Sequence, residues 1–139
     1  MDLLPDKKSS ELLKKAWDLD QEALLKTKNS KRRKKLWRKS MRICQSLLKK
    51  FPREINLLTK IATIYQHQGK FDRAGYFLQK AKKYHPKVFI IDFYFGNLYR
   101  AKENHKLAIK YYLKALKKSK NDKLIKKSIE DYRDYLRNS

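Results

Sequence analysis

A 34-residue spacing constrains the fold of this chain more than any other feature of its sequence. When residues 61–81 are shifted forward by 34 positions, small residues fall on small ones and bulky residues on bulky ones. The matched pairs are Ile61 and Phe95, Ala62 and Gly96, Tyr65 and Tyr99, Ala74 and Ala108, Leu78 and Tyr112, and Ala81 and Ala115. Small residues recur where two helices approach closely, and bulky ones where the gaps are filled. The spacing therefore predicts stacked helical units rather than one amphipathic helix.

The repeating unit resembles the tetratricopeptide repeat, a 34-residue helix–turn–helix. The residues that carry the resemblance are Leu58, Ala62 and Tyr65 on the first helix, and Ala74, Leu78, Ala81 and the terminal Pro86 on the second. Gly69 is suited to the left-handed position that ends the first helix. The resemblance implies an all-α fold, a right-handed superhelical array of about three helix–turn–helix units followed by a C-terminal capping helix.

We expect one domain over residues 1–139, divided by the repeat register. Its parts are a flexible N-terminus (1–8), a divergent first repeat with a basic insertion (9–54), a second repeat (55–88), a third repeat (89–122) and a capping helix (123–139). Leu12, Ala16 and Leu19 match the first-helix pattern only at a shift of 46, on a helix from about Ser10 to Thr27. The twelve additional residues are expected to form a longer connection plus extra turns on the flanking helices.

The third repeat departs from the family pattern at two positions. Asp92 stands where a large apolar residue is expected, and Lys120 replaces the closing proline. Beyond it, a stripe of apolar residues predicts an amphipathic helix that Asn121 or Asp122 can cap. The stripe comprises Ile125, Ile129, Tyr132 and Leu136. Such a helix can cover the apolar end of a stacked array.

Composition limits the class of protein further. Only three glycines and three prolines occur in 139 residues, which favours helices over tight turns. Cys44 is the only cysteine, so no intramolecular disulfide supports the fold. No apolar run approaches the length of a membrane span, and the N-terminus lacks the apolar core of a signal peptide. We therefore expect no membrane insertion and a cytoplasmic location.

In the tetratricopeptide family, the first helices of successive repeats line a concave groove that binds peptides or helices. The register implies that the groove contains small polar donors beside the aromatic pair Phe93 and Tyr94. This groove set is Asn56, Thr59, Lys60, Thr63, Gln66, His67, Ile90, Phe93, Tyr94, Asn97 and Arg100. The alternative is that Phe93 or Tyr94 packs against the neighbouring repeat.

A net charge of +23 is the second feature that bears on function. Residues 31–50 carry ten bases and no acid. Within them lies a basic patch that resembles nucleic-acid-binding segments in composition, namely Lys31, Arg32, Arg33, Lys34, Lys35, Arg38, Lys39 and Arg42. Trp37 belongs to the repeat core by its register. A solvated lysine-rich face without a ligand is the alternative interpretation.

The sequence shows no enzyme motif. His67, His85 and His105 lie apart, with no nucleophile or Gly-rich phosphate loop and no metal-ligand spacing around them. We therefore expect no catalytic residue, cofactor or metal. Two hypotheses follow. The first is an adaptor that binds a peptide or helix of a protein partner, preferably acidic, in the groove. The alternative is an RNA- or ribosome-associated protein that acts through its basic surface.

Overall fold

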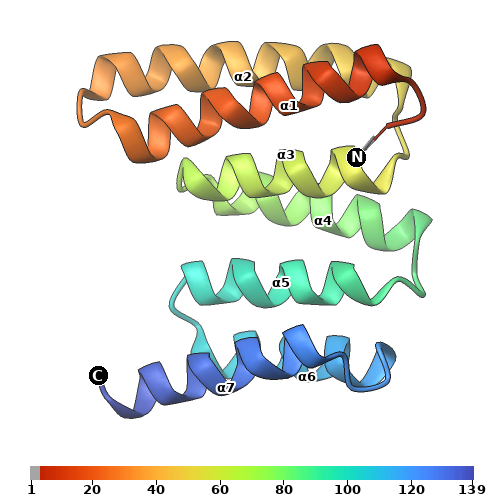
Figure 1. Ribbon diagram of the computed structural model, residues 1–139, viewed down its shortest axis with the longest axis vertical. Helices are drawn as coiled ribbons and strands as arrows, with labels where there is room; N and C mark the ends of the chain where they lie inside the picture. Colours follow the sequence, from red (N-terminus) through yellow and green to blue (C-terminus); the bar gives the residue numbers. More distant parts are fainter. Residues whose placement is uncertain (1–3) are drawn as a thin grey trace. The chain divides into compact units, whose positions relative to one another are not determined.

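The computed structural model describes residues 4–139, and over this range the chain is all-α, as the repeat spacing predicted (Figure 1). The helices are α1 (Lys7–Gln21), α2 (Ser30–Lys50), α3 (Ile55–His67), α4 (Phe71–Tyr84), α5 (Phe89–Ala101), α6 (His105–Lys118) and α7 (Lys123–Arg137), with a π-helical turn η1 (Glu22–Lys26) after α1. The single domain expected from the sequence divides into two compact units, one ending at Tyr84 and the other beginning at His85. None of the described helices is long and apolar enough to cross a membrane.

Leu4 and Asp6 of the first unit contact the start of α1. Residues 1–3 of the segment expected to be flexible lie outside the described residues. Leu4 is buried, and its backbone N–H donates to the Ser10 hydroxyl. Asp6 then caps α1 by accepting a hydrogen bond from the Ser9 backbone N–H at 2.7 Å, which together with the Ser9 hydroxyl lowers the pKa of Asp6 below 3.8. The helix therefore begins at Lys7.

Most of the twelve additional residues of the first repeat are helical. The π-helical turn extends α1 to Lys26, α2 already begins at Ser30, and only residues 27–29 connect them. Asn29 caps α2 by accepting a hydrogen bond from the Arg32 backbone N–H at 2.9 Å. The basic insertion thus lengthens the α1–α2 hairpin instead of forming a long loop.

Small residues allow close approach within each hairpin of the first unit. The Ser40 hydroxyl on α2 donates to the Ala16 carbonyl on α1 at 2.6 Å, and both residues are fully buried. Ala74 and Ala81 of α4 are buried beside α3. Gly69 ends α3 with φ +76°, the left-handed value that was predicted for it.

The second unit contains α5, α6 and α7. Gly96 on α5 lies so close to the Tyr112 ring on α6 that no side chain fits between them. Asp92, which replaces a large apolar residue, is buried and forms an ion pair with Lys118 at 2.7 Å. The predicted apolar stripe of α7 is present: Ile125, Ile129 and Tyr132 are buried, and Leu136 packs against the same cluster.

Candidate functional site

Most side chains of the α3 part of the groove set already form hydrogen bonds or contacts within the first unit. Thr59 is buried, and its hydroxyl donates to the Ile55 carbonyl at 2.9 Å. The Thr63 hydroxyl donates to the Thr59 carbonyl at 2.9 Å. Both hydroxyls therefore bond to the backbone of their own helix, which removes the donors that a peptide would need.

Two further members of the groove set contact α1. The Lys60 ammonium lies 3.9 Å from the centroid of the Trp17 ring, and burial lowers its pKa below 10.5. The His67 Nδ1 lies 2.7 Å from a carboxylate oxygen of Asp20. Asn56 is exposed and Gln66 half-buried on the same helix. Lys60 and His67 are thus already in contact with α1.

Asp20 joins three helices of the first unit. Its carboxylate is completely buried, and it accepts a hydrogen bond from the Trp37 indole N–H at 3.0 Å while it pairs with His67. The Gln21 side-chain amide donates to it at 3.2 Å. A buried carboxylate is stable only with such partners. The hydrogen bond to Asp20 ties the Trp37 ring of α2 to α1.

The α5 part of the groove set is also used within its own unit. Phe93 packs on the Tyr112 ring of α6, with centroids 5.3 Å apart, so this contact lies within one helical hairpin and not with the neighbouring repeat that the alternative named. The Tyr112 hydroxyl donates to the Asn97 side-chain carbonyl at 2.6 Å. Arg100 lies over the Tyr132 ring at 4.4 Å from its centroid. Ile90 and Tyr94 are half-buried.

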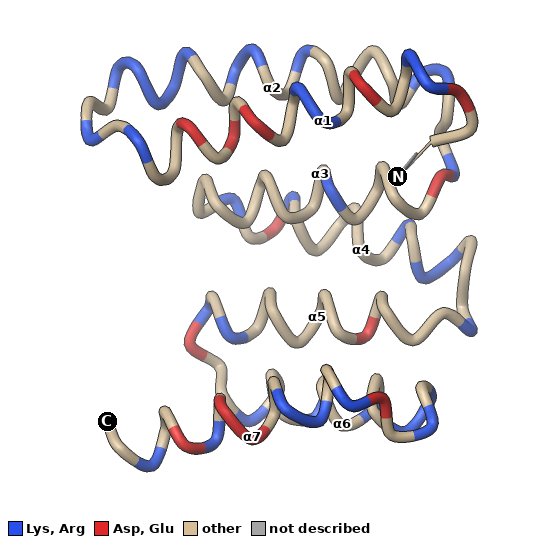
Figure 2. The backbone as a smooth tube through the Cα atoms, viewed as in Figure 1, with Lys and Arg blue, Asp and Glu red and all other residues tan. Residues whose placement is uncertain are grey.

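Figure 2 shows Lys and Arg recurring along the whole of α2, which is continuous through the basic patch. The side chains of the patch separate into three groups. Arg32 and Arg33 hold the hairpin together: Arg32 lies 3.5 Å from Glu22, and the Arg33 side chain donates to the carbonyls of Ala23 and Thr27 at 2.9 Å each. The other two groups follow helical spacing along α2. They are Lys31, Lys35 and Lys39, all exposed, and Lys34, Arg38 and Arg42, which line a pocket.

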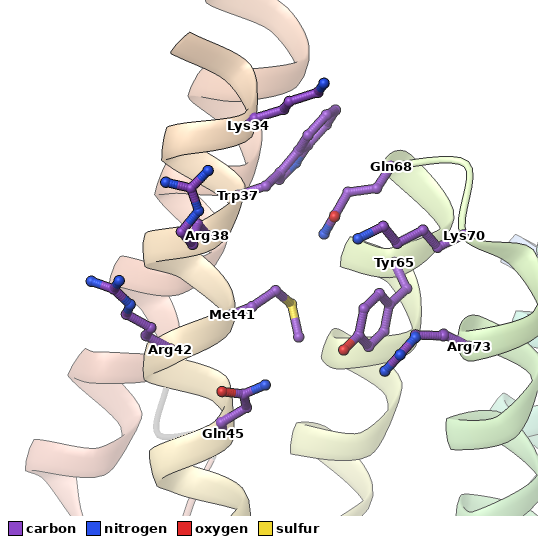
Figure 3. Close-up of a pocket in the computed structure, with 10 residues that line it drawn as sticks. All are labelled: Lys34, Trp37, Arg38, Met41, Arg42, Gln45, Tyr65, Gln68, Lys70 and Arg73. Atoms are coloured by element: carbon purple, nitrogen blue, oxygen red, sulfur yellow. The ribbon is translucent and has the colours of Figure 1, made fainter. Parts of the chain in front are cut away.

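This pocket lies between α2, the end of α3 and the start of α4 (Figure 3). Its volume is about 630 Å³. The residues that line it are Lys34, Trp37, Arg38, Met41, Arg42, Gln45, Tyr65, Gln68, Lys70 and Arg73. Figure 3 shows Trp37 and Met41 of α2 directed across the pocket toward Gln68 and Tyr65 of α3. We call it the α2–α3 pocket.

The lengthened hairpin accounts for the position of the α2–α3 pocket. The α1–α2 hairpin extends past the turn between α3 and α4 (Figure 1), so the first turns of α2 lie beyond the end of α3. That turn is short because Gly69 reverses the chain and Lys70 follows directly. Lys34 and Trp37 therefore form one wall opposite Gln68 and Lys70.

The pocket is strongly cationic. Five of its described lining residues are Lys or Arg, and none is Asp or Glu. The Gln68 side-chain nitrogen is buried and donates no hydrogen bond to any described residue. A buried donor without a partner is costly, so this nitrogen favours a bound acceptor. The pocket can therefore receive a group that carries negative charge and carbonyl or carboxylate oxygens.

The remaining reactive side chains have structural surroundings. Cys44 is buried, and burial raises the pKa of its thiol to about 12, so it is protonated at neutral pH. His105 Nδ1 is hydrogen-bonded to the Tyr132 hydroxyl. Within residues 4–139 no group of three or more His, Cys, Asp or Glu side chains is arranged to hold a metal ion.

Sequence reasoning identified only part of the α2–α3 pocket. It named Lys34, Arg38 and Arg42 as basic but placed Trp37 in the core, and it did not name Gln68, Lys70 or Arg73 as site residues. The available signal was the i, i+4, i+8 spacing of the three α2 bases, which places them on one face of the helix.

Comparison with known families identifies one segment. A family model described as a tetratricopeptide repeat matches residues 57–87, which span most of α3, the turn after it and all of α4. No curated protein matches the chain.

Proposed function

We propose that this chain, which contains a tetratricopeptide repeat at residues 57–87, is an adaptor that binds an acidic segment of a partner protein. Tetratricopeptide repeats generally mediate protein–protein interaction. To this general role the proposal adds that the partner segment is acidic. It also takes the module to be non-enzymatic.

The observation that carries the proposal is the imbalance between engaged acids and exposed bases. The sequence has 37 Lys and Arg residues against 14 Asp and Glu residues. Many of the acids already cap helices or pair with bases of this chain. These are Asp6, Asp18, Asp20, Glu22, Asp92, Asp122, Asp131 and Asp134. The excess positive charge therefore has few internal acids left to neutralise it.

Such a surface favours a negatively charged partner. Uncompensated charge creates a potential of several kT at the surface, which accelerates encounter with an oppositely charged chain and excludes like-charged ones. The attraction acts over about 8 Å at physiological ionic strength, so it should weaken as salt is added.

A direct test measures binding of a fluorescein-labelled oligo-glutamate peptide to the full chain by fluorescence anisotropy. An oligo-glutamine peptide of equal length is the uncharged control. We expect saturable binding of the glutamate peptide at low salt, weaker binding at high salt, and no binding of the glutamine peptide. Equal binding of the two peptides would contradict the proposal.

The predicted groove is the alternative surface for an acidic partner. Its test is Tyr94→Ala rather than a change at Phe93, because Phe93 packs on Tyr112 and its removal would disturb the second unit. If the groove binds the oligo-glutamate peptide, Tyr94→Ala should weaken binding while the far-ultraviolet circular dichroism spectrum stays unchanged. Unchanged affinity would argue against the groove.

RNA binding is a second candidate function, favoured by the exposed row of Lys31, Lys35 and Lys39 on α2. Three lysines that contact phosphates would release counterions and make binding fall steeply with salt. Changing all three to glutamine should weaken binding of an oligouridine probe and reduce the salt dependence of the binding that remains. Equal affinity of the variant and the unmodified chain for this RNA would exclude this row as the RNA-binding surface.

A further inference from the structure

We propose that the α2–α3 pocket is the docking site for an acidic peptide segment that inserts one apolar side chain between Trp37, Met41 and Tyr65. This inference rests on the proposed function, because it names the place and the sequence chemistry of the same acidic partner. It locates the site away from the groove set, none of whose members lines this pocket.

Charge is the first argument. Lys34, Arg38 and Arg42 lie on α2, while Lys70 and Arg73 lie across the pocket at the start of α4. Like charges held around one space repel each other, and a bound polyanion relieves that repulsion. Carboxylates are suitable ligands because arginine donates paired hydrogen bonds to their two oxygens.

The apolar walls are the second argument. Trp37, Met41 and Tyr65 share the pocket with the cations. Trp37 is held in place by its hydrogen bond to buried Asp20, so this wall is formed before any partner binds. Met41 is half-buried, and its flexible thioether can adapt to the shape of an inserted side chain. A purely charged ligand would leave these walls in water.

The Gln68 amide provides a third, directional contact. Its side-chain nitrogen is buried without an acceptor among the described residues and points into the pocket (Figure 3). A peptide offers a backbone carbonyl at every residue. One such carbonyl beside the inserted side chain would accept this hydrogen bond and offset the cost of the buried donor.

The ring environments favour a peptide over RNA in this pocket. Proteins that bind single-stranded RNA stack bases on open aromatic faces. The Tyr65 ring stacks on Phe77, with centroids 5.7 Å apart, and the Arg73 guanidinium lies 5.9 Å from its centroid. Because contacts already cover Tyr65, it gives no open face for a base, whereas its edge can still contact an aliphatic or aromatic side chain.

The test compares two double charge reversals one residue apart on the same helix. Lys34→Glu with Arg38→Glu changes the pocket, and Lys35→Glu with Lys39→Glu changes the net charge by the same amount on exposed positions outside the pocket. The probe is a fluorescein-labelled oligo-glutamate peptide with one central phenylalanine. We expect the pocket variant to lose about tenfold or more in affinity, and the control variant about two- to threefold, from the general field.

A second probe tests the inserted side chain. Replacing the central phenylalanine of the peptide with alanine should weaken binding to the unmodified chain about tenfold, because burial of the ring is lost. The peptide should also change the emission of Trp37. In Trp17→Phe, where Trp37 is the remaining tryptophan, this change should persist, and in Trp37→Phe it should vanish.

The outcomes separate this inference from the proposed function. Failure of the unmodified chain to bind either acidic peptide would overturn both. Binding that both double reversals weaken equally, with no preference for phenylalanine, would leave the acidic-partner function standing and refute the pocket. If the pocket variant alone binds the oligouridine probe more weakly, and its affinity for the peptide is unchanged, the pocket binds RNA. That result would also refute the inference. Circular dichroism melting of each variant checks that the fold is retained.

Discussion

Gly96→Ala gives the sharpest test of how the repeat packs. A Cβ atom at this position on α5 would lie 2.4 Å from Cδ1 and 2.5 Å from Cε1 of the Tyr112 ring. Carbon atoms in contact are normally about 3.5–4.0 Å apart, so the ring would have to move by about 1 Å. Tyr112 is buried at 1% exposure, and its hydroxyl donates to Asn97 at 2.6 Å. Phe93 and Tyr132 pack against the same ring, so it has little room to move.

The expected cost follows from three effects. Overpacking a dense core costs about 1–3 kcal/mol. Weakening the hydrogen bond to Asn97 costs about 1 kcal/mol more. Alanine is better than glycine inside a helix by about 1 kcal/mol, which offsets part of the loss. Gly96→Ala should therefore lower the free energy of unfolding by about 2 kcal/mol, whereas helix propensity alone would raise it.

Urea denaturation followed by circular dichroism measures this change, and hydrogen exchange of the α5 and α6 amides localises it. A double-mutant cycle with Tyr112→Leu isolates the clash. In the Tyr112→Leu background the ring is gone, so Gly96→Ala should become neutral or stabilising by up to about 1 kcal/mol. If Gly96→Ala stabilises the chain that retains Tyr112, the conclusion that α5 and α6 leave no room for a side chain at position 96 is wrong.

Three further predictions concern the first unit. Asp20→Ala removes the acceptor shared by Trp37 and His67 and should cost about 3 kcal/mol in urea denaturation; a loss below about 1 kcal/mol would show that the network contributes little. Arg33→Ala removes the side-chain donors to the carbonyls that end η1 and should cost about 1–2 kcal/mol, with faster hydrogen exchange in the α1–α2 hairpin; Lys35→Ala, at an exposed position, is the control. Burial raises the pKa of the Cys44 thiol from 9.0 to about 12. Because the unfolded chain then loses this proton first, the free energy of unfolding should fall as pH rises from about 9, more steeply than in Cys44→Ala; parallel pH curves would contradict this.

The repeat register was predictable because packing between paired helices imposes strict size limits. Ala74, Ala81 and Gly96 are small because a neighbouring helix lies against them, and that requirement leaves a period in the sequence. Gly69 was predictable for a related reason, since a left-handed residue after a helix favours glycine. Local backbone conformation and close helix contacts each limit the residue type at single positions, so both can be inferred from the sequence.

The candidate site was only partly predictable. The sequence marks Lys34, Arg38 and Arg42 as basic, but it does not distinguish them from Arg33, which bonds to the backbone carbonyls that end η1. The sequence left Phe93 either in the groove or packed against the neighbouring repeat, and it did not indicate the contact with Tyr112 on the adjacent helix α6. In each case the sequence gives the type of side chain. It does not give the partner, because the partner lies far away in the sequence or on another helix.

By itself, the sequence determined the helical repeat, its 34-residue period and its excess of positive charge, because these depend on spacing along the chain and on composition. The tertiary structure alone decided where the added residues go. It shows them extending the α1–α2 hairpin past the α3–α4 turn, which places Trp37 and the α2 bases opposite Gln68 and Lys70. The physical reason is that a pocket depends on the relative lengths and packing of neighbouring helices, and no local pattern in the sequence specifies that relation.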